Sequence, residues 1–246
     1  MILFTIALPI EAKIIKQEIK NLALKSGKID TLITGVGVLN TIYAIKDYID
    51  KNGKPNFIVN IGVCGKKDDT KNDFFQVYRI KNLSNNKESL CPIYIKNFPL
   101  KSLACSDKII TNSSEMGDEN FVDMESFGID FICDKEKIPY IIIKKPFDIV
   151  SKDSLQVSKD ELEKSLQGFP YENLINQIEN FLFQNKKESF ENSIQKLKDS
   201  YRLTFSETQI LKTHINKNIA FGEKENSIIE GLAQLSQKDL LEKIKK

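Results

Sequence analysis

Hydrophobic and polar positions follow two spacings in the first two-thirds of the chain. Short apolar runs, typical of strands buried in a sheet, predict strands at 2–8, 31–34, 57–62, 74–80, 92–95, 103–110 and 140–144. Apolar residues that recur every three or four positions predict helices at 11–21, 39–48 and 124–134. This order of segments predicts an α/β domain with a central mixed sheet flanked by helices.

From about residue 152 onward the strand-like runs stop. Apolar residues between Leu174 and Leu182 share one helical face, which we expect to close the domain. The remainder predicts three or four short helices, the first of them marked by Phe190, Ile194 and Leu197. We therefore predict an α/β domain over 1–184 and an all-helical C-terminal extension over 185–246. The apolar stripes of the extension fit packing onto the domain, and they also fit a dimer or partner surface.

Composition narrows the classes of partner. With 36 Lys and Arg against 34 Asp and Glu, the net charge is +2, so we expect neither nucleic acid nor a membrane surface as partner. The four cysteines form no CxxC pair, which is typical of free thiols in a reducing, cytoplasmic compartment. The single histidine, His214, excludes a multi-histidine zinc site. We expect no metal and no cofactor.

Three acidic residues follow predicted strands. Glu11 comes after the first strand across Pro9, Glu125 after a short apolar run, and Asp148 after the 140–144 strand by way of Pro146. Open α/β sheets bind ligands at the carboxyl ends of their strands. Each residue alone also fits a structural role at a helix N-terminus or in a turn. Because three such carboxyl groups come from different strands, we predict that they converge on one site.

Two glycine turns also follow strands. Gly35 and Gly37 resemble a dinucleotide-binding fingerprint that lacks its third glycine. The acidic residue expected about 20 positions further on is absent, since Asn60 stands there, so we exclude a Rossmann cofactor site. A close approach of the backbone to a ligand remains consistent with this turn and with the second one at Gly62–Gly65.

These segments together resemble a known family. The resemblance rests on five motifs, in order Ala7-Leu8-Pro9-Ile10-Glu11-Ala12, Thr34-Gly35-Val36-Gly37, Asn60-Ile61-Gly62-Val63-Cys64-Gly65, Val122-Asp123-Met124-Glu125-Ser126 and Ile143-Lys144-Lys145-Pro146-Phe147-Asp148. In this order and spacing, the chain resembles the nucleoside phosphorylase superfamily. It is most similar to the branch of the methylthioadenosine/S-adenosylhomocysteine nucleosidases.

The resemblance implies a role for each acidic residue. Asp148 would protonate N7 of a purine or donate a hydrogen bond toward it, and Glu125 would hold the ribose hydroxyls, with Met124 beside the sugar. Glu11 would deprotonate the water that attacks C1′, so one carboxyl group acts as acid and another as base, as in an inverting glycosidase. The other implied substrate-binding residues are Gly35, Gly62, Cys64, Gly65, Ile110 and Phe147.

Departures from the family pattern bear on the reaction. Phosphorylases of the superfamily hold phosphate with arginine and serine, but Asn60 and Val63 occupy those places here, and the chain has only two arginines, Arg79 and Arg202. Hydrolysis is therefore favoured over phosphorolysis. Phe147 replaces a serine, Lys144 stands where the family usually carries an arginine, and 111–120 is shorter than the family's loop.

The expected function is that of a purine nucleoside N-glycosidase acting on methylthioadenosine- or S-adenosylhomocysteine-like nucleosides. Two alternatives remain open, a purine nucleoside phosphorylase and a non-catalytic nucleoside-binding protein whose helical tail binds a partner. Since the family commonly forms dimers, the resemblance also implies a homodimer.

Overall fold

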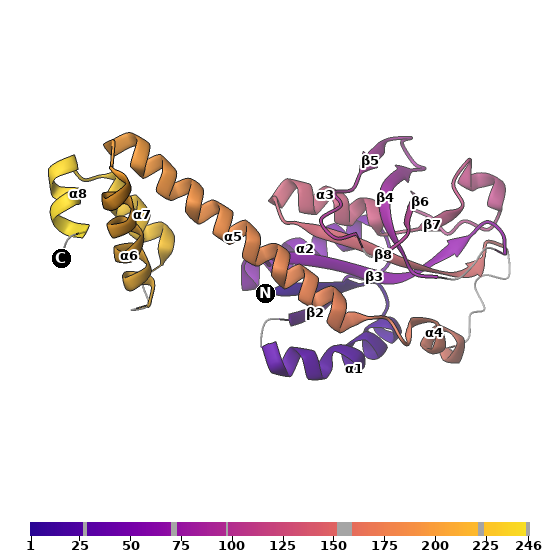
Figure 1. The fold of residues 1–246 in the computed structure, drawn as a ribbon. Helices are drawn as coiled ribbons and strands as arrows, with labels where there is room; N and C mark the ends of the chain where they lie inside the picture. Colours follow the sequence, from indigo (N-terminus) through magenta and orange to yellow (C-terminus); the bar gives the residue numbers. More distant parts are fainter. Residues whose placement is uncertain (27–28, 70–72, 97, 152–158, 221–223, 245–246) are drawn as a thin grey trace. The chain divides into compact units, whose positions relative to one another are not determined.

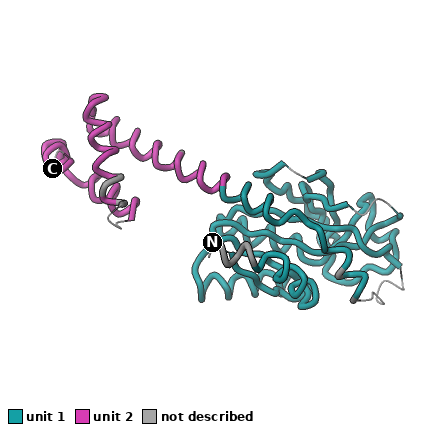
Figure 2. The backbone as a smooth tube through the Cα atoms, turned by 60° about the horizontal axis from the view of Figure 1, so that its bottom comes forward, with its two compact units in different colours: residues 1–179 teal, residues 180–246 magenta. Residues whose placement is uncertain are grey.

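The computed structural model describes residues 1–246 except 27–28, 70–72, 97, 152–158, 221–223 and 245–246. The chain divides into two compact units, residues 1–179 and 180–246 (Figure 2). One helix, α5 (Tyr171–Tyr201), contains the boundary between them. None of the helices within the described ranges is both long and apolar enough to span a membrane.

The first unit is built on one eight-stranded mixed sheet (Figure 1). Its strands are β1 (Ile2–Ile6), β2 (Ile29–Ile33), β3 (Phe57–Lys66), β4 (Phe75–Asn82), β5 (Glu88–Leu90), β6 (Leu100–Cys105), β7 (Phe121–Asp123) and β8 (Tyr140–Ile149). The helices of this unit are α1 (Pro9–Ser26), α2 (Val38–Asn52), the 3₁₀ turn η1 (Ser113–Met116), α3 (Ser126–Glu136), α4 (Lys159–Leu166) and the start of α5. The expected class, a mixed sheet flanked by helices and followed by C-terminal helices, is confirmed.

Part of the sheet closes on itself. β3 pairs in parallel with β1 and β8, and its last residues, Gly65 and Lys66, pair antiparallel with β7. β7 then pairs with β6, β6 with β4, and β4 with β8, which returns to β3. The five strands form a closed ring, which brings the carboxyl ends of β3, β7 and β8 together.

The two faces of the sheet are covered by different helices. Leu3 of β1 packs in a core cluster with Ile45 of α2 and Ile129 of α3. The neighbouring residue Phe4 points to the other face, where its ring lies 6.3 Å from that of Tyr171 at the start of α5. This alternation follows from the two-residue period of a strand, and both faces are apolar because both carry helices.

Several predicted boundaries are wrong. The 92–95 segment is not a strand: β5 is 88–90, and the ladder ends where the Cys91 N–H donates to the Tyr78 carbonyl, because Pro92 has no N–H to continue it. The strand predicted at 103–110 ends at Cys105, where Ser106 bonds the backbone of Lys108 in a turn. β3 and β8 instead run longer than predicted, to Lys66 and Ile149.

The second unit has a hydrophobic core of its own. It comprises the end of α5, α6 (Phe205–Ala220), α7 (Glu225–Ala233) and α8 (Gln237–Ile244). The separate helix expected around Phe190 to Leu197 is wrong, since these residues continue α5, with no proline or glycine to end it. The buried side chains of this core are Ile194, Leu197, Leu203, Leu211, Ile215, Ile228, Leu232, Leu240 and Ile244.

Candidate active site

A pocket of about 280 Å³ lies where β1, β3, β7 and β8 end. The structure brings eight of the ten residues expected from the sequence to its wall: Glu11, Gly62, Cys64, Gly65, Ile110, Met124, Glu125 and Asp148. Gly35 and Phe147 do not line it. Val36, which follows Gly35, takes its place in the wall, and Phe147 is the neighbour of Asp148 in β8, a strand whose side chains alternate between faces.

Glu11 is held in a fixed orientation by backbone groups. It lies in the first turn of α1 and is buried, with 2% of its surface exposed. Oε1 accepts a hydrogen bond of 3.0 Å from the Val63 N–H of β3, and Oε2 accepts one of 3.0 Å from the Leu8 N–H. Burial raises the pKa of this carboxyl group, against the opposing effect of the Val63 bond and the charge of Lys144. The carboxylate is therefore both fixed and a stronger base than an exposed glutamate.

Gly62 leaves the space that Glu11 occupies. A Cβ atom at Gly62 would lie 3.0 Å from Oε1 of Glu11 and 3.6 Å from its Cδ. The close approach of the backbone expected at this turn is thus made toward a site carboxylate, and a side chain at residue 62 would displace it.

Glu125 stands at the N-cap of α3 and is 6% exposed. Its Oε1 accepts a 3.1 Å hydrogen bond from the Gly37 N–H, so the second glycine of the first turn, rather than Gly35, contacts the site. Its Oε2 lies 3.8 Å from Nζ of Lys144. Burial raises the pKa of Glu125 to about 7, with Asp123 acting in the same direction and Lys144 against it.

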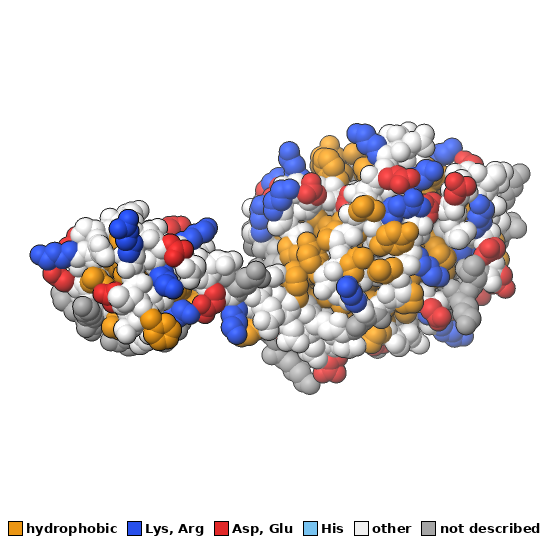
Figure 3. Space-filling model, turned by 45° about the horizontal axis from the view of Figure 1, so that its top comes forward, with side chains coloured by type: hydrophobic (Ala, Val, Ile, Leu, Met, Phe, Trp, Pro, Cys, Tyr) orange, Lys and Arg blue, Asp and Glu red, His pale blue; other side chains and the backbone are white. Residues whose placement is uncertain are grey.

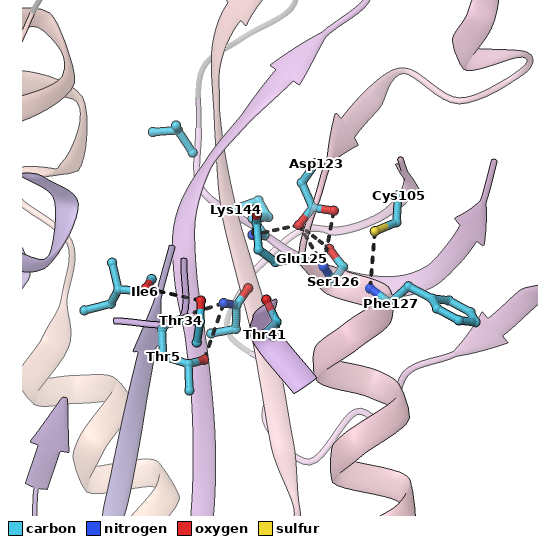
Figure 4. A network of polar contacts seen from close by, with 12 residues as sticks. Thr5, Ile6, Thr34, Thr41, Cys105, Asp123, Glu125, Ser126, Phe127 and Lys144 are labelled. Carbon is cyan, nitrogen blue, oxygen red and sulfur yellow. Dashed lines mark hydrogen bonds and ion pairs between the residues drawn. The ribbon is translucent and has the colours of Figure 1, made fainter. Parts of the chain in front are cut away.

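Asp123 and Lys144 form a buried ion pair that sequence reasoning did not place in the site. Nζ of Lys144 is 2.8 Å from Oδ2 of Asp123, and both side chains are almost completely buried (Figure 4). Asp123 also accepts hydrogen bonds from the backbone N–H and the hydroxyl group of Ser126 at the start of α3. Burial alone would lower the pKa of Lys144, but the two carboxylates raise it above its ordinary value. The lysine at an expected arginine position pointed to Lys144, whereas Asp123 lay inside the 122–126 motif but was assigned no role.

The remaining wall is mainly apolar. Asp148 lines the pocket from β8 and is partly exposed, and Lys108, also in the wall, is paired with Glu115 at 3.2 Å. Apolar contacts come from Leu8, Val36, Ile61, Val63, Ile109, Val122 and Val150. A mostly apolar pocket with a few fixed carboxyl groups can hold a flat base and a polyhydroxylated sugar. In the part of the chain that is described, no group of three or more Asp, Glu, His or Cys is arranged to hold a metal ion.

Solved structures with a similar fold include nucleosidases and a futalosine hydrolase. A methylthioadenosine/S-adenosylhomocysteine nucleosidase of Helicobacter pylori, in complex with an inhibitor, superposes with a TM-score of 0.57 at 14% identity, over 76% of this chain and 97% of that one. This protein has the fold of the methylthioadenosine/S-adenosylhomocysteine nucleosidases. No family model and no curated protein matches its sequence.

Two further structures show how much of this chain the similar fold covers. A variant of the nucleosidase of Chlamydia trachomatis, bound to methylthioadenosine, gives a TM-score of 0.53 at 18% identity, over 70% of this chain and 97% of that one. A mutant futalosine hydrolase of Helicobacter pylori gives 0.56 at 14% identity, over 76% and 98%. The nucleosidase fold thus accounts for about three quarters of this chain and nearly all of its neighbours.

Proposed function

We propose that this protein is a purine nucleoside N-glycosidase, which hydrolyses the bond between base and ribose in methylthioadenosine- or S-adenosylhomocysteine-like nucleosides. One observation carries the proposal: Glu11, Glu125 and Asp148, which come from three different segments, line one pocket. The activities for which the structural neighbours are named, as nucleosidases and a futalosine hydrolase, support the same class of reaction.

Each carboxyl group has a role in the proposed reaction. Asp148 donates a hydrogen bond or a proton to N7 of the purine, which makes the base a better leaving group. Glu125 accepts hydrogen bonds from the ribose hydroxyls and holds C1′ in place. Glu11, oriented by Val63 and Leu8, takes the proton of the attacking water as positive charge develops on the sugar. Each proton transfer contributes about 10²–10⁴ to the rate.

The positions of the cations favour water over phosphate as the nucleophile. Arg79 is paired with Glu119 at 2.7 Å and with Glu88 at 3.3 Å. Lys144 in the pocket wall is bound to Asp123. A phosphate would have to displace these carboxylates to gain a charge-assisted hydrogen bond.

The test is release of free base. Purified protein is incubated with methylthioadenosine, S-adenosylhomocysteine or futalosine in phosphate-free buffer, and free adenine or hypoxanthine is measured by chromatography. We expect release without phosphate, with Asp148→Asn and Glu11→Gln each lowering kcat by about 10²-fold or more. Release only after phosphate is added would identify a phosphorylase, and tight binding without release would identify a binding protein.

We also propose a homodimer that forms through the outer surface of α2 and α3. Hydrophobic side chains gather on one face of the first unit (Figure 3). Leu39 and Tyr43, one helical turn apart on α2, are 67% and 70% exposed, and Phe131 on α3 is 51% exposed. α2 and α3 pack closely at Gly128, and exposed apolar side chains on adjacent helices favour association.

A further inference from the structure

The pocket holds more buried negative charge than positive charge. Glu11, Asp123 and Glu125 are between 2% and 6% exposed, and Lys144 is the one equally buried cation among the described residues of the wall. Lys108, the other basic residue there, is exposed and paired with Glu115. One ammonium group faces three carboxyl groups, and a buried carboxylate is stable only with a partner.

Lys144 lies between two of these carboxyl groups. Its Nζ is 2.8 Å from Asp123 and 3.8 Å from Oε2 of Glu125, while the Gly37 N–H holds the other oxygen of Glu125. Figure 4 shows Lys144 and Asp123 joined beside Glu125. Asp123 is fixed in turn by Ser126 at the start of α3. The orientation of Glu125 therefore depends on one backbone N–H and one ammonium group.

We infer that Lys144 is a positioning residue, which favours the ionised form of Glu125 and directs it at the ribose hydroxyls, and that Asp123 limits this effect by binding the same ammonium group. The inference rests on the proposed function, because it concerns how the ribose-binding carboxylate is prepared. Lys144 does not itself exchange a proton with the nucleoside. Its charge also lowers the pKa of Glu11, so the kinetic profile reports both carboxyl groups and the spectroscopic titration isolates Glu125.

The charged groups around Glu125 determine whether each substitution raises or lowers its pKa. Lys144 on β8 and the Gly37 N–H favour its charged form, whereas Asp123 on β7 and Glu11 on α1 oppose it. Cys105 on β6 also lies near, but burial raises the pKa of its thiol, so it stays neutral. Removing Lys144 must therefore raise the pKa of Glu125, and removing the charge of Asp123 must lower it.

These opposite signs make the test. If Glu125 must be ionised to bind ribose, kcat/KM rises with pH through its pKa, which burial places at about 7. In Lys144→Met this rise moves to higher pH by about one unit or more, which is about a tenfold loss at a fixed pH on the slope. In Asp123→Asn the rise in kcat/KM moves to lower pH. In Lys144→Arg, which keeps the positive charge, the pH profile stays that of the wild type.

A matched control comes from the same strand. Lys145, the next residue of β8, places its ammonium group 4.6 Å from the ring centre of Phe74. We expect Lys145→Met to leave the pH profile unmoved. Equal losses at every pH in Lys144→Met and Asp123→Asn, with unmoved profiles, would mean that the pair only supports the fold and would overturn the inference.

A second measurement does not depend on turnover. The titration of the Glu125 carboxyl group is followed by infrared spectroscopy of protein labelled with ¹³C-glutamate, with Glu125→Gln to identify the band. Opposite shifts of this titration in Lys144→Met and Asp123→Asn support the inference even if the wild type releases no base, an outcome that would reject only the proposed function. If Lys144→Met does not fold, Asp123→Asn carries the test: a downward shift supports the inference, and an unmoved titration rejects it.

Discussion

Replacing Gly62 by alanine tests whether the backbone of β3 sets the position of Glu11. The added Cβ would lie 3.0 Å from Oε1, so the carboxylate must move by a few tenths of an ångström. That movement weakens the 3.0 Å bond from the Val63 N–H. The backbone at Gly62 lies outside the left-handed region, so alanine is not strained there by itself.

The size of the effect follows from the hydrogen bond. A bond to a charged group contributes about 1.5–3 kcal/mol, and losing half of it costs about 1 kcal/mol. We therefore expect Gly62→Ala to lower kcat about five- to tenfold, with KM little changed, because the change displaces Glu11, the proposed water-activating base, and not the proposed nucleoside contacts. Kinetics of base release measure this directly, and thermal unfolding checks that the fold is retained.

The double variant with Glu11→Ala separates this cause from a general disturbance. Trimming residue 11 removes the atom with which the new Cβ collides, so Gly62→Ala should add no further loss in that background. If the double variant loses the same five- to tenfold again relative to Glu11→Ala, the effect does not pass through Glu11 and the reasoning is refuted.

Three further predictions follow from the described contacts. The pKa of Glu125 is raised from 4.5 to about 7 in the folded protein, so its contribution to the free energy of unfolding is complete below pH 4.5 and is lost as the pH rises through 7. We expect Glu125→Gln to reduce this pH-dependent loss of stability, as measured by urea unfolding at several pH values. Gly128→Ala should destabilise the first unit by about 1–3 kcal/mol, because its Cβ would lie 2.7 Å from the Val38 carbonyl oxygen. As a control, Gly231→Ala should stabilise α7 by about 0.5–1 kcal/mol, because no atom lies within 4 Å of the added Cβ. Leu39→Asp should convert the proposed dimer to a monomer in light scattering, and an unchanged mass would exclude this face as the interface.

Local pattern was sufficient for much of the fold. The apolar runs that became β1, β3 and β8 and the spacing that became α1, α2 and α3 predicted the mixed sheet with its helices, since burial on both faces leaves a continuous apolar run. The position of Glu11, Glu125 and Asp148 after strands was enough to predict a common pocket, because open α/β sheets bind ligands at the carboxyl ends of their strands. The failures included whole elements as well as boundaries: the 92–95 segment is not a strand, and residues 190–197 continue α5 instead of forming a separate helix.

The electrostatics of the site was decided only by tertiary structure. The Val63 N–H that donates to Glu11 is 52 residues away in the sequence, and the Gly37 N–H that donates to Glu125 is 88 residues away. The pairing of Lys144 with Asp123 likewise requires β7 and β8 to join the same closed ring of strands. Residue type and spacing can indicate which carboxyl groups reach a pocket. Their pKa values and orientations depend on burial and on donors supplied by distant segments, and no local pattern records those.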